Sequence, residues 1–250
     1  MIASFLSALQ FLTVIPVRLK TANEQRMASS MVYFPLVGLL LGLFLAGLNA
    51  LLSFLNLPSL AMNVITVVVL IMVTGGLHLD GLSDTADAFL SGKPREQMLE
   101  IMRDSRSGVM GVLSLISVIL LKIALLFSIS VSLQLNALML MCVLSRWSAV
   151  ATMFFFPYAR QEGKAGAFIK GMNLKIFILS AVAAVICASI AWQVRGLFVL
   201  LIVTGFSYAL GKFSTKKIGG ITGDTLGATI ELTEIVTLST VFILEGVMHG

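Results

Sequence analysis

The sequence predicts an all-α fold, a polytopic helical bundle in a membrane, on three observations. Of its 250 residues, 58% are hydrophobic and only 12% are charged, whereas soluble domains carry about 25% charged residues. Its mean hydropathy is +1.02. The hydrophobic segments follow one another without a long polar block between them. We therefore expect one integral membrane domain over residues 1–250.

Seven apolar segments are predicted to cross the bilayer, where a spanning helix needs about 20 mostly apolar residues. They lie near 31–55, 60–77, 176–194, 197–211 and 227–247, with two more between 109 and 156 that are divided around Gln134. The turn at 56–58 (Asn-Leu-Pro) separates the first two. Residues 2–17 are apolar but short, and the sequence leaves open whether they cross the bilayer, re-enter it or lie along its surface.

The distribution of basic residues predicts the orientation of the spans, because Lys and Arg accumulate in cytoplasmic loops. One side receives the loops 18–30, 79–108, 157–175 and 212–226. These loops hold fourteen of the seventeen basic residues: Arg18, Lys20, Arg26, Lys93, Arg95, Arg103, Arg106, Arg160, Lys164, Lys170, Lys175, Lys212, Lys216 and Lys217. The opposite side receives only Arg195, and Lys122 and Arg146 lie within spans. We expect the basic side to face the cytoplasm.

A first acidic cluster follows the second predicted span, where residues 75–87 read GGLHLDGLSDTAD. Asp80, Asp84 and Asp87 are spaced i, i+4, i+7, so on a helix they lie on one face. Carboxylates at this spacing repel one another unless a cation joins them, and such oxygen ligands suit Mg²⁺ or Mn²⁺ together with substrate phosphates. The pattern predicts a divalent-metal site; the alternative is a solvated acidic helix end. His78 is a candidate ligand or acid–base group, against a structural role.

Basic side chains that suit an anionic substrate follow. Arg103 and Arg106 stand in MRDSRSG at 102–108, and guanidinium groups match phosphate oxygens bidentately; the alternative is a positively charged anchor at a helix start. Lys122 and Arg146 lie deep in apolar runs, where a cation costs roughly 2.5–3.5 kcal/mol on insertion scales. They must therefore be paired or face a polar cavity, so carboxylates and substrate phosphates are their candidate partners.

A second acidic segment begins the last span, where residues 222–234 read TGDTLGATIELTE. Asp224 and Glu231 are seven residues apart, hence on one face of a helix that begins at Asp224. Glu231 and Glu234 point into the span, where an ionisable residue is a functional candidate. The alternative is that both glutamates pair with Lys122 and Arg146 to hold the bundle together. The two interpretations are compatible.

These motifs resemble the bacterial adenosylcobinamide-GDP ribazoletransferases, also called cobalamin synthases. The resemblance rests on GGLHLDGLSDTAD, MRDSRSG, Lys122 within an apolar span, Ser145-Arg146 and TGDTLGATIELTE, in this order over about residues 5–245. It implies a Mg²⁺-dependent enzyme of the bacterial inner membrane, with its active site facing the cytoplasm. Lipid and the two substrates would be its partners, nucleic acid would not, and an oligomer is compatible with the sequence.

The resemblance also implies a reaction. A ribose hydroxyl of α-ribazole, or of its 5′-phosphate, attacks the cobinamide-linked phosphorus of adenosylcobinamide-GDP; GMP leaves, and adenosylcobalamin or its 5′-phosphate forms. The expected metal ligands are Asp80, Asp84, Asp87 and Asp224; the expected phosphate-binding residues are Arg103, Arg106, Lys122 and Arg146; and the candidates for a general base are His78, Asp87 and Glu231.

Two other functions match parts of the sequence. The CDP-alcohol phosphotransferases perform comparable chemistry, but their motif has an Ala-Arg after the first Asp-Gly, where this chain has Leu82-Ser83-Asp84. A cation-coupled transporter would use Asp80, Asp84 and Glu231 as an ion pathway and would need polar openings on both faces. The nearly uncharged second side counts against a transporter.

Overall fold

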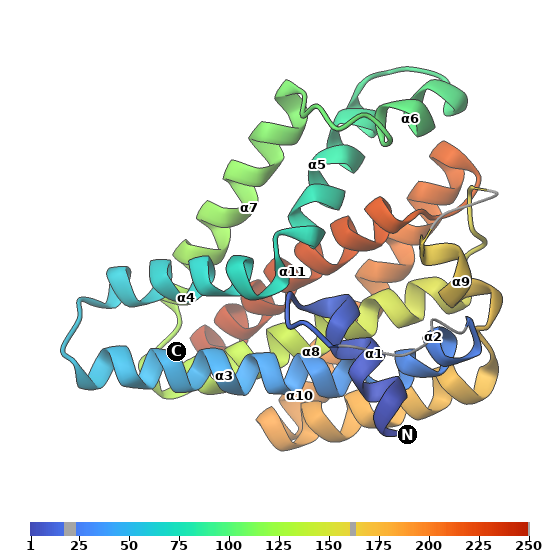
Figure 1. The fold of residues 1–250 in the computed structure, drawn as a ribbon. Helices are drawn as coiled ribbons and strands as arrows, with labels where there is room; N and C mark the ends of the chain where they lie inside the picture. Colours follow the sequence, from blue (N-terminus) through green and yellow to red (C-terminus); the bar gives the residue numbers. More distant parts are fainter. Residues whose placement is uncertain (18–23, 161–163, 250) are drawn as a thin grey trace.

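The computed structural model describes residues 1–17, 24–160 and 164–249, and in this part it is helical throughout apart from turns and one isolated β-bridge. Arg18 and Lys20, which contributed to the predicted orientation, lie outside the described residues. In chain order the helices are α1 (Ile2–Leu12), α2 (Glu24–Ser30), a 3₁₀ turn (Met31–Tyr33), α3 (Phe34–Phe54), α4 (Ser59–Thr74), α5 (Leu77–Leu90), α6 (Arg95–Ile101), α7 (Val109–Ser128), α8 (Val131–Phe155), α9 (Lys164–Lys170), α10 (Leu174–Ile218) and α11 (Gly223–His249) (Figure 1).

Two helices form the centre of the bundle. Helix α8 packs most extensively against α3, α10 and α11, and α11 packs in turn against α5, α7 and α8. From Ala137 to Met153 every residue of α8 is buried. Outer helices instead leave apolar side chains uncovered, as on α7, where Leu113, Ile116 and Leu120 are all at least half exposed. An uncovered apolar face of this kind suits contact with lipid.

A sharp bend separates α4 from α5. The two helices meet at 90°. Gly75 and Gly76 occupy the bend with φ of 63° and 67°, a left-handed conformation that is strained for residues with a Cβ. The predicted span 60–77 therefore ends at Thr74, and α5, which carries the first acidic cluster, leaves the axis of α4 as a separate helix (Figure 1).

The predicted division around Gln134 is displaced by a few residues. Helix α7 ends at Ser128 and α8 begins at Val131, so Gln134 lies inside α8. Its buried side-chain amide donates a hydrogen bond of 3.2 Å to the carbonyl of Leu126 in the last turn of α7. The backbone N–H of Ser130 donates to the Glu245 carboxylate at 3.2 Å. Gln134 thus lies within α8 and donates to one of the last carbonyl groups of α7, which have no N–H donor within the helix; it is not part of the turn itself.

Helix α10 covers both segments predicted at 176–194 and 197–211. Its backbone is not helical at Trp192 and Gln193, where φ reaches 49° at Gln193. The two halves approach each other closely on either side of this break. A Cβ on Gly196 in the second half would collide with the carbonyl oxygen of Ala188 in the first. The second half continues to Ile218, so part of the predicted loop 212–226 is helical.

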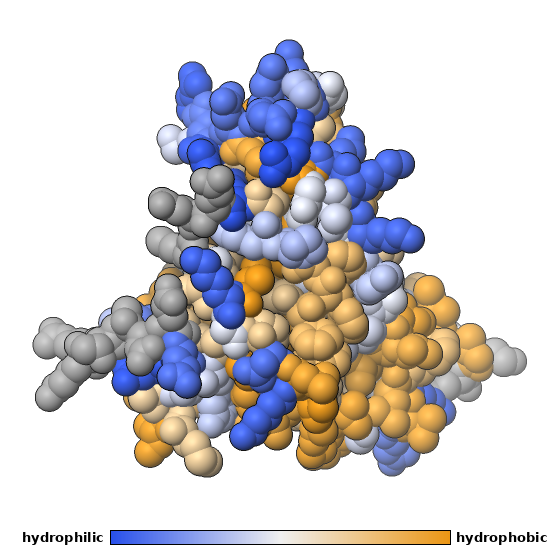
Figure 2. Space-filling view, turned by 90° about the vertical axis from the view of Figure 1, so that its right-hand side faces the viewer, coloured by the Kyte–Doolittle hydropathy of each residue, from blue (hydrophilic) through white to orange (hydrophobic). Residues whose placement is uncertain are grey.

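Among the described residues, five helical segments are long and apolar enough to cross a membrane, and α4 with α5 makes a sixth if the bent pair is one span. Helix α1, with eleven residues, is shorter than a span. Figure 2 shows hydrophilic side chains gathered at the top of the face it presents, where Figure 1 places α6 and the end of α5, and hydrophobic ones toward the bottom and one flank. The fold is that of a multi-pass membrane bundle with a polar end.

Candidate active site

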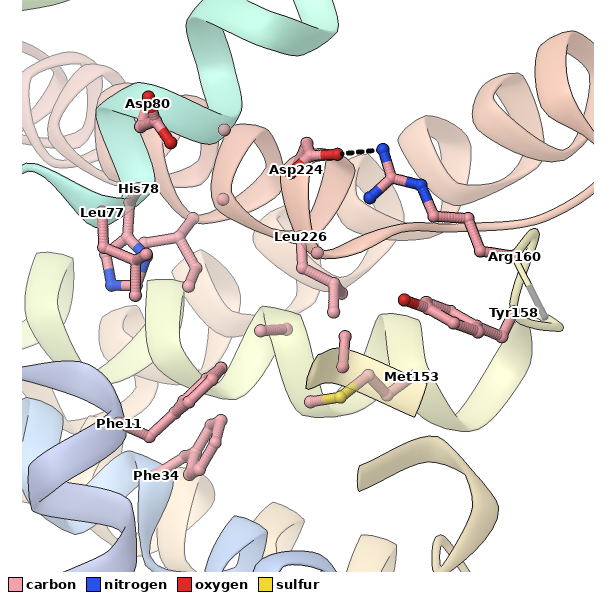
Figure 3. Close-up of a pocket in the computed structure, with 16 residues that line it drawn as sticks. Phe11, Phe34, Leu77, His78, Asp80, Met153, Tyr158, Arg160, Asp224 and Leu226 are labelled. Carbon is pink, nitrogen blue, oxygen red and sulfur yellow. Dashed lines mark hydrogen bonds and ion pairs between the residues drawn. The ribbon is translucent and has the colours of Figure 1, made fainter. Parts of the chain in front are cut away.

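A cavity of about 230 Å³ lies where α5, α8 and α11 meet the segment after α8. Its lining comes from parts of the chain far apart in sequence: Phe11, Phe34, Leu77, His78, Asp80, Gly81, Ala149, Met153, Tyr158, Arg160, Ala165, Gly223, Asp224, Leu226, Gly227 and Ile230. In Figure 3 the acidic side chains and Arg160 lie along one edge, and the phenylalanines and Met153 lie on the opposite side. The cavity therefore has a polar rim and an apolar floor.

Two glycines let α5 and α11 approach closely enough to form one wall of this cavity. A Cβ on Gly81 would lie 2.7 Å from the carbonyl oxygen of Asp224, and one on Gly227 would lie 3.0 Å from the carbonyl oxygen of His78. Because real Cβ atoms essentially never come within 3.0 Å of other heavy atoms, a side chain at Gly81 would force the helices apart. Asp80 and Asp224 are neighbours because their helices cross at small residues.

The carboxylates of the rim differ in their surroundings. Asp80 is exposed at the mouth and Asp84 is half-buried one turn further along α5; among the residues described, neither accepts a hydrogen bond or forms an ion pair. Asp84 lies within electrostatic range of the carboxylates of Asp80, Asp87 and Asp224. Asp224 is paired: Arg160 donates to its Oδ2 at 2.7 Å (Figure 3). Negative charge is thus concentrated where α5 meets α11.

Arg160 and Tyr158 are site residues that the sequence motifs did not indicate. The segment after α8 pairs with the segment before α11, with Ile221 N–H donating to Pro157 at 2.8 Å and Ala159 N–H donating to Ile221 at 2.9 Å. This pairing turns both side chains toward the cavity. Partial burial raises the pKa of the Tyr158 phenol, and the nearby Arg160 opposes the rise. No local pattern marks either residue, and Arg160 was counted only as a loop charge.

Asp87 has a different environment from Asp80 and Asp84. Its two carboxylate oxygens accept backbone N–H bonds from Gly108 at 2.6 Å and Gly111 at 2.8 Å, at the start of α7. The first N–H groups of a helix have no carbonyl acceptor within that helix. The Asp87 carboxylate acts as the acceptor for two such groups at the start of α7. Its predicted role as metal ligand or base stays a prediction.

The two arginines of the MRDSRSG segment lie at the polar end. Arg103 is exposed and within electrostatic range of Tyr158, which places it near the cavity rim. Arg106 is also exposed and pairs with Asp104 at 2.7 Å. Hydrogen bonds from the Arg106 side chain and backbone hold the pKa of Asp104 below its usual value. Phosphate binding by these arginines stays a prediction.

A fully buried charge network lies between α7, α8 and α11. Lys122 pairs with Glu231 at 2.5 Å and also with Glu234, which Arg146 contacts as well. All four side chains are at most 6% exposed. The structure therefore contains the pairing that the sequence offered as the alternative to a catalytic role. Direct phosphate binding by Lys122 and Arg146 stays a prediction, as does a base role for Glu231.

His78 lies between this network and the cavity. It lines the cavity, is 3% exposed, and its Nε2 is buried without a hydrogen-bond partner among the described residues. Lys122, Arg146 and Glu234 are all within electrostatic range of the imidazole. A polar group of a ligand bound in the cavity would satisfy this nitrogen.

Comparison with known proteins gives the family. The sequence model described as Cobalamin-5-phosphate synthase matches residues 4–242. A protein of Desulforamulus reducens named adenosylcobinamide-GDP ribazoletransferase is 40% identical over 234 residues, covering 94% of each chain. One of that name from Klebsiella pneumoniae is 40% identical over 245 residues, covering 95% of this chain and 98% of its own. No solved structure matches.

The chain belongs to the cobalamin-5-phosphate synthase family. The matched range includes every site residue predicted from the sequence and both residues that only the structure revealed. It also includes every residue that lines the cavity. The expected family is therefore confirmed.

The carboxylates of the rim do not by themselves form a metal-binding cluster among the described residues. Within residues 1–17, 24–160 and 164–249, no group of three or more His, Cys, Asp or Glu side chains is arranged to hold a metal ion. Asp80 and Asp224 nevertheless both line the cavity, with Asp84 in electrostatic range. Mg²⁺ usually binds one or two carboxylates, waters and substrate phosphates instead of an all-protein cage. The acidic rim fits that mode of binding.

Proposed function

We propose that the protein joins adenosylcobinamide-GDP to α-ribazole, or to α-ribazole 5′-phosphate, and releases GMP. The main support for this proposal is that Asp80 of α5 lies with Asp224 and Arg160 on the rim of the same cavity. Diphosphate chemistry needs carboxylates for a metal ion and cationic groups for the phosphates. Membership of the family and the names of its relatives supply the substrates.

The proposed reaction changes two bonds at one phosphorus. A ribose hydroxyl oxygen of the acceptor bonds to the phosphorus attached to cobinamide, and the bond from this phosphorus to the bridging oxygen breaks. GMP leaves with that oxygen, and the hydroxyl proton passes to a base. The cavity contributes mainly by orienting the two substrates and by balancing charge on the transferred phosphoryl group.

We assign Mg²⁺ binding to Asp80 and Asp224, the two carboxylates that line the cavity, together with phosphate oxygens of the substrate; Asp84 and Asp87 lie nearby and are further candidates. Bound Mg²⁺ would neutralise charge on the diphosphate. Arg160 is well placed to exchange partners, because it lines the cavity and its buried Nε has no hydrogen-bond partner among the described residues. When the diphosphate binds, the guanidinium can turn to a phosphate and leave Asp224 to the metal.

Of the three candidate bases, His78 has the most support. It lines the cavity with a free ring nitrogen, whereas both oxygens of Asp87 are occupied by the start of α7 and Glu231 is ion-paired to Lys122. A neutral imidazole within reach of the acceptor hydroxyl can take its proton.

We further propose seven spans, with the cavity facing the cytoplasm of a bacterial plasma membrane. The break at Trp192 and Gln193 divides α10 into two spans, which adds one to the six counted with the bent pair. The excess of basic residues in the loops beside the cavity supports the orientation. Cysteines introduced one at a time at positions 99 and 195 (Leu99→Cys and Arg195→Cys), in a background without the native Cys142 and Cys187, should react from opposite sides of sealed vesicles; labelling of both from the same side would contradict this topology.

The activity itself is tested with purified protein in detergent. Incubation with adenosylcobinamide-GDP, α-ribazole and Mg²⁺ should yield GMP and a cobalamin product, each detected chromatographically. Absence of both products, under conditions where a relative from Klebsiella pneumoniae is active, would refute the proposal.

The metal assignment has its own test. Asp80→Asn and Asp84→Asn should each abolish Mg²⁺-dependent transfer while the protein still inserts into membranes. Glu96→Gln is a matched control, since it removes an exposed carboxylate of the polar end that lies outside the cavity. Full activity in both aspartate variants would overturn the assignment.

A further inference from the structure

The floor of the cavity is apolar and well packed. Phe34, Ala149, Met153, Leu226 and Ile230 line it and are all at most 6% exposed. The aromatic rings that close it are held in place: Phe11 stacks on Phe34 with centroids 5.8 Å apart, and Phe168 lies behind Phe11 at 4.5 Å. Phosphate chemistry on the rim does not use this floor, so it is available for another part of a substrate.

We infer that this floor is the subsite for the aromatic base of the acceptor, the dimethylbenzimidazole ring of α-ribazole. The inference rests on the proposed function and assigns one of its two substrates to the cavity. The whole cavity, polar rim included, has a volume of about 230 Å³, equal to roughly eight water molecules of about 30 Å³ each, so a bicyclic ring can occupy the floor while a much larger group cannot. Apolar walls with a few polar groups at the mouth are typical of small-molecule sites.

The other bulky groups of the reaction fit the floor less well. A corrin macrocycle is several times larger than the cavity and has to remain outside it. Guanine has amide and amino groups along its edge. Beside Phe34, Met153 and Ile230 these groups would lose their hydrogen bonds to water and find no replacement, which is costly. Dimethylbenzimidazole has one free ring nitrogen and otherwise only apolar surface, so its burial leaves little unsatisfied.

This placement orients the acceptor. With the base among the phenylalanines and Met153, the attached ribose lies toward the rim, beside Asp80, Asp224 and Arg160 (Figure 3). The attacking hydroxyl is then held where the diphosphate of the donor binds. Positioning of this kind is a main source of rate enhancement in phosphoryl transfer.

The test compares acceptors that differ only in the base. The full-length protein in detergent is assayed with adenosylcobinamide-GDP, Mg²⁺ and the α-riboside of either dimethylbenzimidazole or unsubstituted benzimidazole. Because a missing methyl group in an apolar pocket costs about tenfold or more, the wild type should prefer the dimethyl acceptor by at least about tenfold in kcat/KM. Ala149→Val narrows the floor and should reduce this preference to about twofold or less.

Two further variants keep the test decisive. Ala151→Val makes the same change two residues along α8, at a position that is 1% exposed but packs beside Trp147 and Ala184, away from the cavity; it should leave the preference unchanged. Met153→Ala enlarges the floor and should raise kcat/KM for a bulkier naphthimidazole riboside relative to the dimethyl acceptor, even if Ala149→Val fails to fold.

Binding of the ribosides without donor, measured by equilibrium dialysis, should show the same order of affinities. An unchanged base preference in both Ala149→Val and Met153→Ala overturns the subsite, as does an effect confined to the KM of the donor. These outcomes require an active wild type, so they are distinct from failure of the proposed function, in which the wild type forms no product with either acceptor.

Discussion

Removal of Lys122 should destabilise the bundle strongly, because its ammonium group holds two glutamates together in a buried site. Lys122 is 3% exposed and pairs with Glu231 at 2.5 Å and with Glu234, while Arg146 supplies the second positive charge. The four charges sum to zero. Lys122→Met leaves a net charge of −1 that neither water nor another cation compensates.

The size of the effect follows from the burial of the network. Breaking a buried ion pair by removing one partner costs about 3–5 kcal/mol. At about 2–4 °C for each kcal/mol in a chain of this length, the melting temperature should fall by roughly 6–20 °C. The double variant Lys122→Met/Glu231→Gln restores neutrality and should recover most of the loss, because one cation and one anion are removed together.

The assay is thermal unfolding of the purified protein in detergent, followed by tryptophan fluorescence. Lys216→Met is the matched control, since it removes the same charge from an exposed position near the end of α10, where substitutions usually change stability by less than about 0.5 kcal/mol. If Lys122→Met has the same melting temperature as the control, or if the double variant is no more stable than the single one, the argument from buried charge is wrong.

Four other predictions concern the cavity, the residues that support it and the proposed metal ion. Gly81→Ala should destabilise by about 1–3 kcal/mol and lower activity, since its Cβ would lie 2.7 Å from the carbonyl of Asp224; a fully active variant of unchanged melting temperature would contradict the close crossing. Asp87→Ala should cost about 0.5–2 kcal/mol in thermal unfolding, because two N–H groups at the start of α7 lose their acceptor. Arg160→Gln should raise the KM for adenosylcobinamide-GDP about tenfold by removing a charge-assisted contact to phosphate, with the KM for α-ribazole unchanged. Chelation by EDTA should abolish transfer and added Mg²⁺ should restore it; activity that persists after chelation would remove the metal from the proposal.

The sequence predicted the parts of this structure that depend on composition and short spacing. Membrane helices are set by long apolar runs, and a helix over Asp80, Asp84 and Asp87 follows from a four- and three-residue spacing. The ends of the helices were predicted less accurately, because they depend on tertiary contacts. The junction after α7 is held partly by Glu245, whose carboxylate accepts a hydrogen bond from Ser130 although it lies 115 residues further along the chain, and no local window shows this contact.

The same limit explains which site residues were missed. Tyr158 and Arg160 reach the cavity only because the segment after α8 pairs with Ile221, about sixty residues later. The three carboxylates on α5 do share a helix, but the structure gives them different neighbours: α11 approaches Asp80 through the crossing at Gly81, and the start of α7 engages Asp87. Spacing along one helix shows that groups share a face and leaves open which other helix meets each of them.

Depth in the bundle separates the charges of this site into two sets with different roles. Lys122 and Arg146 are fully buried and neutralised by glutamates, so binding of a phosphate by either would require an ion pair to break in a medium of low dielectric constant. Asp80 and Arg103 are exposed at the polar end, where exchange of partners costs far less. We therefore expect the buried set to hold α7, α8 and α11 in position beneath His78, and the rim to bind the substrates. If this division is correct, Lys122→Met/Glu231→Gln should retain measurable transfer once stability is restored, whereas Asp80→Asn should remain inactive at any stability.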